Sequence, residues 1–401
     1  MIQSNGELHG RLAESDSFSP IAQHSVRYSD EGDTVDINIG WPQRRLAVLA
    51  VITALGLLTF APPQHLAAKE KAATIYVPLV LTAPPPLTSL LLAFLSDRDS
   101  NTQIYTMQAD GSGVNRLTDT AWYKGPPVWA PDGTQIAFAA NPNTPTTNWD
   151  VYAMQSDGSN VMNLTDSPSY DGNLAWSPDG RQIAFESDRD GNNEIYVMDS
   201  NGANQVNLTA NPARDTGAAW SPDGTQIAFI SDRSGTPGLY VMAASGANPT
   251  RLADATPSRV PAWSPDGQRI AYAFDSNIWM LALPAAPVQL TDFPSQWASV
   301  IGHPVWSPDG AQLVFEHAFN YTPSSRASLY AIMADGSEPT PRNLGQGGYP
   351  AWSRDGGYLA YNTSSYAIVG VTAQIHVRTM RNGDDLQLTT GANNYGATWQ
   401  P

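Results

Sequence analysis

Few residues in this chain have the types and spacing needed for catalysis. The chain has 401 residues, six histidines and no cysteine, which excludes disulfides, thiolate zinc sites, iron–sulfur clusters and cysteine nucleophiles. His303, His317 and His376 are the histidines of the repeated region described below, and no two of them have metal-ligand spacing. No G-x-S-x-G motif occurs, so a serine hydrolase of the α/β type is not predicted. We predict no catalytic residue and no metal ligand, and we favour a non-enzyme while leaving the question open.

One acidic segment has the composition of a cation site. Residues 187–194, S-D-R-D-G-N-N-E, carry oxygen-bearing side chains at alternating positions, similar to a calcium loop. Their glycine stands two positions too early for an EF-hand, and related turns recur at 96–99 and 231–234. Recurrence favours a structural role, in which the carboxylate binds turn amides and the arginine pairs locally. No cofactor is therefore predicted, and calcium is the alternative.

A second set of chemically active side chains stands a few residues ahead of each recurring tryptophan. Its members differ from copy to copy, as a specific pocket would require, although drift in unconstrained loops gives the same pattern. They are Lys124, Asp171, Asp215, Arg259, His303, Tyr349 and Tyr395. One interpretation is a polysaccharide lyase or hydrolase in which His303 acts beside Asp171 and Asp215.

The elements that would position these residues come from an internal repeat. A tryptophan, followed in most copies by S-P-D-G, recurs at spacings of 47, 44, 43, 43, 46 and 47 residues. The seven anchors are Trp129, Trp176, Trp220, Trp263, Trp306, Trp352 and Trp399. Between anchors come a run such as I-A-F, then S-D-R, then I-Y-x-M, then D-G and finally L-T. Short β-branched and aromatic runs between turn residues predict strands, and S-P-D-G and D-G are hairpin turns.

Four such strands form a small sheet that cannot bury both of its faces alone. A period of about 40–45 residues is typical of propeller blades packed face to face around an axis. The first I-A-F equivalent, Leu92–Phe94, has no tryptophan strand before it, and the last tryptophan strand, 396–400, has no I-A-F after it. We therefore predict an all-β, seven-bladed propeller over residues 91–401, closed by strand exchange between the two ends of the repeat region. In such a ring the seven variable residues ahead of the tryptophans are expected at the mouth of the central channel, and we call them the mouth residues.

The repeats resemble the WD-like, PD-type repeats of TolB-like propellers, which also form the propeller domain of prolyl-oligopeptidase-like proteins. The resemblance covers residues 91–401 and implies the fold. Departures occur at Pro284–Pro287, which replaces a D-G turn, and at Trp352–Gly356, which reads W-S-R-D-G. Seven units exceed the six blades of TolB, and residues 64–90 are too few for the TolB N-terminal domain. The resemblance therefore does not carry the TolB function.

The loops break the symmetry of the predicted propeller on one face. The S-P-D-G and D-G turns share one face and are uniform, whereas the connections on the other face are enlarged at 141–150, 293–303, 317–327 and 362–373. These loops carry Trp149, Trp297, Phe319 and Tyr321. Aromatic side chains on loops favour recognition of a protein or a glycan, and folding back onto their own blade is the alternative.

The N-terminal part predicts export. Residues 1–43 are polar and are expected to be disordered. Arg44 and Arg45 precede an apolar or small run at 46–61, which ends at Pro62 and Pro63 and reads as a signal anchor or a signal peptide within 44–63. Residues 64–90 form a Pro-rich spacer.

Charge limits the class of partner. The net charge is −16, which argues against nucleic-acid binding because phosphate affinity comes from Lys and Arg. We predict an exported or membrane-tethered monomer that is extracytoplasmic, membrane-anchored or secreted. It would bind a protein or cell-envelope glycan through the enlarged-loop face and contact the membrane through residues 46–61 if they are not cleaved.

Overall fold

The computed structural model describes residues 25–28, 35–38, 84–142, 148–255, 260–294, 300–302, 304–318, 327–338, 340–363 and 372–401. The chain divides into two compact units, Met1–Thr82 and Ala83–Pro401. In the first unit, β1 (Ser25–Tyr28) and β2 (Val35–Asn38) form an antiparallel pair. The predicted membrane-targeting run at 46–61 lies outside the described residues. Among the residues that are described, no helix is long and apolar enough to span a membrane.

The second unit consists of seven antiparallel sheets, here called blades 1 to 7. Blade 1 contains β32 (Asn394–Trp399), β3 (Leu91–Asp99), β4 (Asn101–Gln108) and β5 (Asn115–Arg116). Blade 2 contains β6 (Tyr123–Lys124), β7 (Val128–Trp129), β8 (Gln135–Asn141), β9 (Asp150–Gln155) and β10 (Met162–Asn163). Blade 3 contains β11 (Asp171–Trp176), β12 (Gln182–Ser187), β13 (Glu194–Asp199) and β14 (Val206–Asn207).

The remaining blades repeat this order. Blade 4 contains β15 (Asp215–Trp220), β16 (Gln226–Ser231), β17 (Gly238–Ala243) and β18 (Thr250–Asp254). Blade 5 contains β19 (Ala262–Trp263), β20 (Arg269–Phe274), β21 (Asn277–Ala282) and β22 (Val288–Gln289). Blade 6 contains β23 (Val300–Ile301), β24 (Val305–Trp306), β25 (Gln312–Ala318), β26 (Ser328–Met333) and β27 (Arg342–Gln346). Blade 7 contains β28 (Gly348–Trp352), β29 (Tyr358–Asn362), β30 (Ile375–Thr379) and β31 (Asp385–Gln387).

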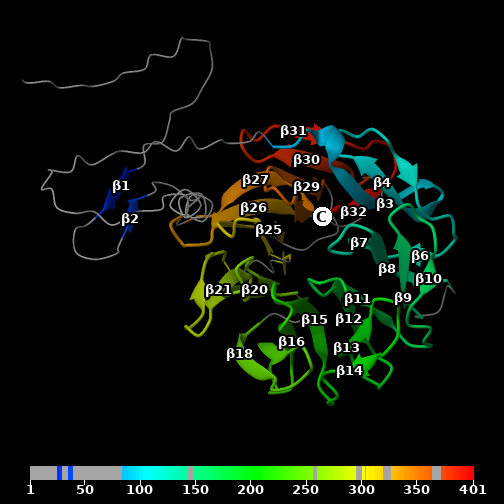
Figure 1. The fold of residues 1–401 in the computed structure, drawn as a ribbon, viewed down its shortest axis with the longest axis horizontal. Helices are drawn as coiled ribbons and strands as arrows, with labels where there is room; N and C mark the ends of the chain where they lie inside the picture. Colours follow the sequence, from blue (N-terminus) through cyan, green and yellow to red (C-terminus); the bar gives the residue numbers. More distant parts are fainter. Residues whose placement is uncertain are drawn as a thin grey trace, which may run out of the picture. The chain divides into compact units, whose positions relative to one another are not determined.

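The sheets stand around a central axis, with tryptophan strands such as β7, β11 and β15 innermost and β10, β14 and β18 at the rim (Figure 1). The predicted strand exchange is confirmed. The C-terminal strand β32 pairs antiparallel with β3, and Trp399 is the partner of Leu92. The two ends of the repeat region therefore share blade 1, and the fold is an all-β, seven-bladed propeller.

The I-A-F motif explains how one blade packs on the next. Along a strand successive side chains point to opposite faces, so Ile183 and Phe185 of blade 3 share one face and Ala184 lies on the other. Ile183, Phe185 and Trp176 pack against the small residues Ala137 and Ala153 of blade 2. On its other face, Ala184 lies in the cluster formed with the large side chains of blade 4. At these junctions, large side chains of one blade thus pack against small side chains of the preceding blade. Each buried Ile or Phe contributes about 1.5–3 kcal/mol to the free energy of unfolding.

The tryptophans also join neighbouring blades through a polar bond. The indole N–H of Trp176 donates to the carbonyl of Val128 in blade 2 at 3.2 Å, and that of Trp399 donates to the carbonyl of Ala351 in blade 7 at 2.9 Å. Equivalent bonds come from Trp220, Trp263 and Trp306. Because each indole reaches the residue just before the preceding tryptophan, these bonds link the inner strands around the ring.

The S-P-D-G turns adopt the predicted conformation. In blade 3, the hydroxyl of Ser177 donates to Asp179 at 2.7 Å, and the amide of Gly180 donates back to the Ser177 carbonyl at 2.9 Å. Gly180 has φ +69°, a conformation that side chains rarely adopt. The turns repeat these contacts from blade to blade and make one face of the propeller uniform.

The segment just before β3 also packs on the propeller. The hydroxyl of Tyr358 in blade 7 donates to the carbonyl of Pro85 at 3.1 Å. The short 3₁₀ helix η1 (Leu87–Ser89) places Leu87 against the core shared by blades 7 and 1, and the Leu87 carbonyl accepts the Ala109 amide at 3.1 Å. These contacts cover the junction at which the ring closes.

Candidate functional site

The S-D-R turn holds the start of each inner strand. The carboxylate of Asp188 accepts the backbone amide of Tyr170 at 2.8 Å. The same bond joins Asp232 to the amide of Arg214 at 2.9 Å in blade 4, and Asp97 to the amide of Asn393 at 2.8 Å in blade 1. The aspartate of this turn therefore binds a backbone amide in three blades, and this amide belongs to the residue ahead of the inner strand, not to the turn as predicted.

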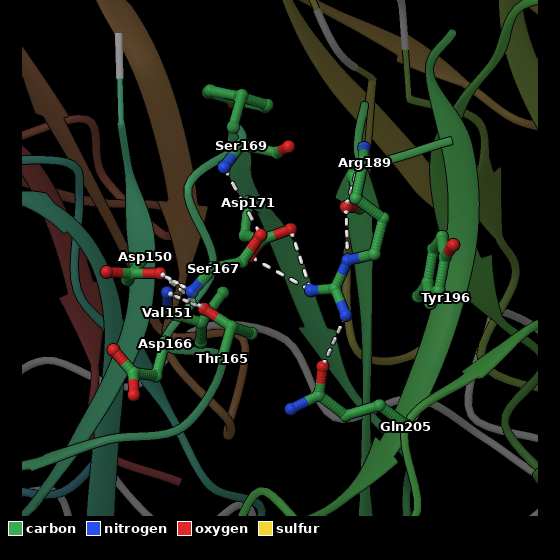
Figure 2. A network of polar contacts seen from close by, with 12 residues as sticks. Asp150, Val151, Thr165, Asp166, Ser167, Ser169, Asp171, Arg189, Tyr196 and Gln205 are labelled. Carbon is green, nitrogen blue, oxygen red and sulfur yellow. Dashed lines mark hydrogen bonds and ion pairs between the residues drawn. The ribbon is translucent and has the colours of Figure 1, made fainter. Parts of the chain in front are cut away.

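The arginine of the same turn binds the next residue of the inner strand. The Nη2 atom of Arg189 lies 3.0 Å from both carboxylate oxygens of Asp171, which is fully buried (Figure 2). Arg233 binds Asp215, also fully buried, at 3.0 Å. The guanidinium of Arg189 stacks 4.8 Å from the ring centre of Tyr196. Two of the predicted mouth residues, Asp171 and Asp215, thus lie beneath the mouth in charge pairs.

Two blades vary this arrangement by placing a neutral amide or a lysine at the aspartate position. In blade 1 the position holds Asn394, whose side-chain oxygen accepts from Arg98 at 3.0 Å. Blade 2 has no S-D-R turn, and its equivalent residue is Lys124, which is buried. The Lys124 ammonium donates to the carbonyls of Thr102, Thr120 and Trp122 at 3.0–3.1 Å, and burial lowers its pKa to about 8. Lys124 is therefore also a buried scaffold residue.

The remaining predicted mouth residues have different surroundings. Tyr349 is 44% exposed and has φ +52°, and its backbone amide donates to Glu316 at 3.3 Å. Tyr395 in β32 is half-buried, and burial raises its pKa. Arg259 and His303 lie outside the described residues.

Among the predicted loop aromatics, Trp149 is described and lies at a junction between blades. It is half-buried just before β9, and its carbonyl accepts the amide of Asp171 at 2.7 Å. Blade 2 thereby places an indole at the start of the inner strand of blade 3. Trp297, Phe319 and Tyr321 lie outside the described residues.

A cavity of about 480 Å³ opens at this junction on the enlarged-loop face. It is lined by residues of blades 2, 3 and 4, namely Trp149, Tyr170, Asn173, Glu186, Asp188, Asn193 and Arg214. We call it the blade 3 pocket. Its walls combine two aromatic rings, two carboxylates, two amides and one guanidinium. Its volume lies in the range of small-ligand sites, and its lining is more polar than that of most such sites.

Glu186, at the end of β12, is the most buried carboxylate of the pocket lining, with 4% of its surface exposed. One oxygen accepts the Gly217 amide of blade 4 at 2.7 Å, and the other accepts the Asn173 side chain at 3.0 Å. Burial raises the pKa of Glu186, while these bonds and the charge of Arg214 oppose the rise. Glu186 therefore joins two blades and offers a firmly held acceptor.

A β-bulge brings Asn173 to Glu186. The register of β11 against β12 shifts between Gly172 and Ala175, and Asn173 takes φ +47°. Gly217 occupies the equivalent bulge position in β15 of blade 4 and has φ +70°. Bulges redirect a side chain at the cost of local regularity, and here the redirected amide lines the blade 3 pocket.

Tyr170 is one of the two aromatic residues that line the pocket. Burial, followed by the charges of Glu186, Asp188 and Asp171, raises the pKa of Tyr170 to about 12, so the phenol stays protonated. Within the described part of the chain, neither this hydroxyl nor the indole N–H of Trp149 has a hydrogen-bond partner. Both remain available as donors to a bound molecule.

The pocket residues Tyr170 and Arg214 were not identified from the sequence. Each stands one position before a predicted mouth residue, and the corresponding residues of blades 1 and 2 are Asn393 and Tyr123. The aspartate position repeats because it pairs with arginine, whereas the preceding side chain is free to differ. A register count from each tryptophan would have identified this variable position.

The carboxylates of the calcium-like segment at 187–194 each bind a different partner. Asp188 binds the Tyr170 amide, Asp190 binds the hydroxyl of Tyr196, and Glu194 binds the hydroxyl of Thr209. Across the described ranges, no group of three or more His, Asp or Glu side chains has a geometry that could hold a metal ion.

Comparisons with known proteins agree with this architecture. A family model described as the TolB beta propeller domain matches residues 121–206 and 168–273. TolB from Acinetobacter baumannii has a TM-score of 0.52 and 17% identity, over 80% of this chain and 69% of that chain. An oligogalacturonate lyase in complex with manganese has a TM-score of 0.54 and 16% identity, over 74% of this chain and 84% of that one.

A third structure, from a study of two prolyl endopeptidases, has a TM-score of 0.55 and 14% identity. The similarity covers 73% of this chain and 46% of that chain, so this chain spans under half its length. A search of curated proteins found no match. The fold defines a seven-bladed β-propeller. Residues 121–273 match the model of the TolB beta propeller domain, and the tryptophan-anchored repeats of the other blades resemble those of the matched part. At these identities the similar structures share the fold alone.

Proposed function

We propose that this protein is an exported or membrane-tethered binding module that recognises a protein or cell-envelope partner through its enlarged-loop face. The observation that carries the proposal is the blade 3 pocket, which combines Trp149 with differing polar side chains on that face. On the opposite face the S-P-D-G turns are alike and their polar groups are bonded within each turn. The enlarged-loop face therefore offers a partner side chains that differ from blade to blade.

Residues 46–61 support the export part of the proposal, because an apolar run that follows two arginines is a common targeting pattern. An extracytoplasmic chain without cysteine does not depend on the redox state of its compartment. Its net charge of −16 favours contact through specific groups over broad attraction to acidic polymers. We therefore place the proposed partner in the cell envelope.

The test uses the full-length chain, immobilised and incubated with envelope extract, and compares the wild type with Trp149→Ala. A specific partner should be retained by the wild type and reduced about tenfold or more by Trp149→Ala, because aromatic anchors carry much of an interface's affinity. Trp297→Ala and Tyr321→Ala test the other predicted loop aromatics in the same way.

The matched control is Arg181→Ala, in the turn of blade 3 on the opposite face, where the side chain is 85% exposed. Partner retention should be unchanged by this variant. Equal retention by Trp149→Ala, Trp297→Ala, Tyr321→Ala and the wild type would contradict the face assignment. Turnover of an envelope polysaccharide in the same mixture would instead support the lyase or hydrolase interpretation.

A further inference from the structure

We infer that the blade 3 pocket binds a neutral sugar ring, a deduction that rests on the proposed function and specifies the chemistry of its ligand. The argument comes from the balance of donors and acceptors around the cavity of about 480 Å³. Such a volume holds a small ligand or one to two units of a longer one.

The donors of the pocket lie beside its acceptors. Trp149 and Tyr170 supply an N–H and an O–H with no partner among the described residues, and Arg214 adds an exposed guanidinium. The acceptors are the second oxygen of Asp188 and the carboxylate of Glu186, held by the Gly217 amide and the Asn173 side chain. A ligand must therefore donate and accept within a few ångströms. Vicinal hydroxyl groups do this, because each is both a donor and an acceptor.

The charges of the pocket disfavour other ligand classes. An acidic ligand would face Glu186 and Asp188, and a cationic ligand would face Arg214. The negative charge of Glu186 is already stabilised by two hydrogen bonds and by the positive charge of Arg214. Two carboxylates against one guanidinium make the pocket slightly negative, which disfavours an acidic ligand, while the exposed Arg214 guanidinium disfavours a cation.

The aromatic walls complete the argument for a ring. Trp149 and Tyr170 present large apolar faces with a polar edge. A pyranose has two faces of C–H groups and an equator of hydroxyls, so it packs on such walls while its edge reaches Asp188, Asn193 and Arg214. A linear polyol lacks these flat faces and would bind less tightly.

The experiment is isothermal titration calorimetry of the full-length chain with a fixed panel. The neutral probes are glucose, galactose, mannose, N-acetylglucosamine, cellobiose, lactose and chitobiose. Digalacturonate, glycine and lysine represent acidic, zwitterionic and cationic ligands, respectively. At least one neutral disaccharide should bind, and digalacturonate, glycine and lysine should bind at least about tenfold more weakly.

Substitutions of lining residues test whether the sugar binds in the blade 3 pocket. Trp149→Ala and Arg214→Ala should each weaken the sugar about tenfold, and Tyr170→Phe about threefold. Tyr123→Phe is the matched control, because Tyr123 stands at the same repeat position in blade 2 and should leave binding unchanged. Gly172→Ala tests shape alone, since a Cβ there would stand 2.5 Å from the Tyr170 hydroxyl. This variant should also weaken binding, and circular dichroism checks the folding of each variant.

A second arm separates free sugar from polymer. The same chain is mixed with cellulose, chitin or peptidoglycan, with and without the best soluble sugar as competitor. Binding to a polymer that the sugar displaces identifies a glycan, and binding of the soluble sugar alone identifies a free saccharide. Either outcome supports the inference.

Three outcomes would overturn it. These are no binding by any neutral probe, tighter binding of digalacturonate or an amino acid, and sugar binding that Trp149→Ala leaves unchanged. If an envelope partner is still retained in a Trp149-dependent manner, is destroyed by protease and is not displaced by sugar, the proposed function stands and the sugar inference fails. If retention also fails, both are wrong.

Discussion

The two faces of the propeller are built from the same repeat, but one face is alike from blade to blade and the other differs. On the S-P-D-G face, serine and aspartate bind each other and the turn amides in blades 3 to 6, and the turn glycines of blades 3 to 7 lie close to the proline of the preceding blade. On the enlarged-loop face, the Asp–Arg pairs of blades 3 and 4 repeat, but the residues beside them are Tyr170 and Arg214.

The difference shows where this fold tolerates variation. A buried position takes a side chain that satisfies its partner, as aspartate does in blades 3 and 4 and asparagine does in blade 1, because an unpaired buried charge costs several kcal/mol. A position next to it, with only its backbone amide engaged, can take any side chain. The pocket is built from such neighbouring positions, so the molecule gains a distinctive surface without altering its scaffold.

The largest expected effect tests whether the C-terminal strand β32 closes the ring of blades. Deleting residues 396–401 removes Trp399, which is 8% exposed and bound to Ala351. Truncating a buried Trp alone costs about 3–5 kcal/mol, and an exposed sheet edge is added. We expect a destabilisation of more than about 5 kcal/mol and aggregation, measured by thermal unfolding and light scattering. An equal deletion within residues 1–40 is the control, and equal melting temperatures would rule out closure by β32.

The next effect sharpens the distinction between scaffold and pocket. Asp171→Ala leaves Arg189 without its buried partner, and we expect a loss of about 3–5 kcal/mol in denaturant unfolding. Asp171→Asn reproduces the Asn394–Arg98 arrangement of blade 1, so its cost should be about 1 kcal/mol. Equal costs for the two variants would mean that Asp171 acts by its charge alone.

A pH effect concerns His317, which is fully buried in β25 and stacks 3.9 Å from the ring centre of Phe293. Burial lowers its pKa to about 4. Between pH 6.5 and 4 the unfolded chain binds a proton that the folded chain does not, so stability falls as pH falls, by about 3 kcal/mol at pH 4. His317→Phe should flatten this part of the profile, measured by denaturant unfolding at several pH values. An unchanged profile in His317→Phe would show that other groups dominate.

A smaller effect compares two copies of the tryptophan. Trp176→Phe loses the hydrogen bond to Val128, whereas the indole N–H of Trp129, among the described residues, has no partner. The two substitutions remove the same atoms, so Trp176→Phe should cost about 1 kcal/mol more. Chemical denaturation of both variants measures the difference. The reverse order would mean that packing volume, not the bond, sets the role of these indoles.

The smallest effect is expected on the loop face. Trp149→Ala should change the unfolding free energy by only about 1 kcal/mol or less, because the side chain is half-buried and its carbonyl bond to Asp171 remains. The same variant should abolish most of the proposed binding. A large loss of stability would place Trp149 in the scaffold and remove the basis of the comparison.

The sequence alone determined the fold and its closure. Seven tryptophans at regular spacing, with turn residues at fixed places between short apolar runs, are compatible with one arrangement, since a blade cannot bury both faces alone. The unpaired halves at Leu92–Phe94 and 396–400 predicted the strand that β32 supplies. Local turn chemistry and strand period repeat often enough to make these conclusions firm.

The tertiary structure decided which side chains share a pocket. Asp171 and Asp215 stood out in the sequence by their charge, yet Arg189 and Arg233 bury both of them. The side chains that open into the cavity come from three blades, and a bulge at Asn173 turns one of them inward. Neither the partner that neutralises a charge nor the face of a bulged strand is a local property. Both depend on contacts between residues distant in sequence, which only the assembled ring brings together.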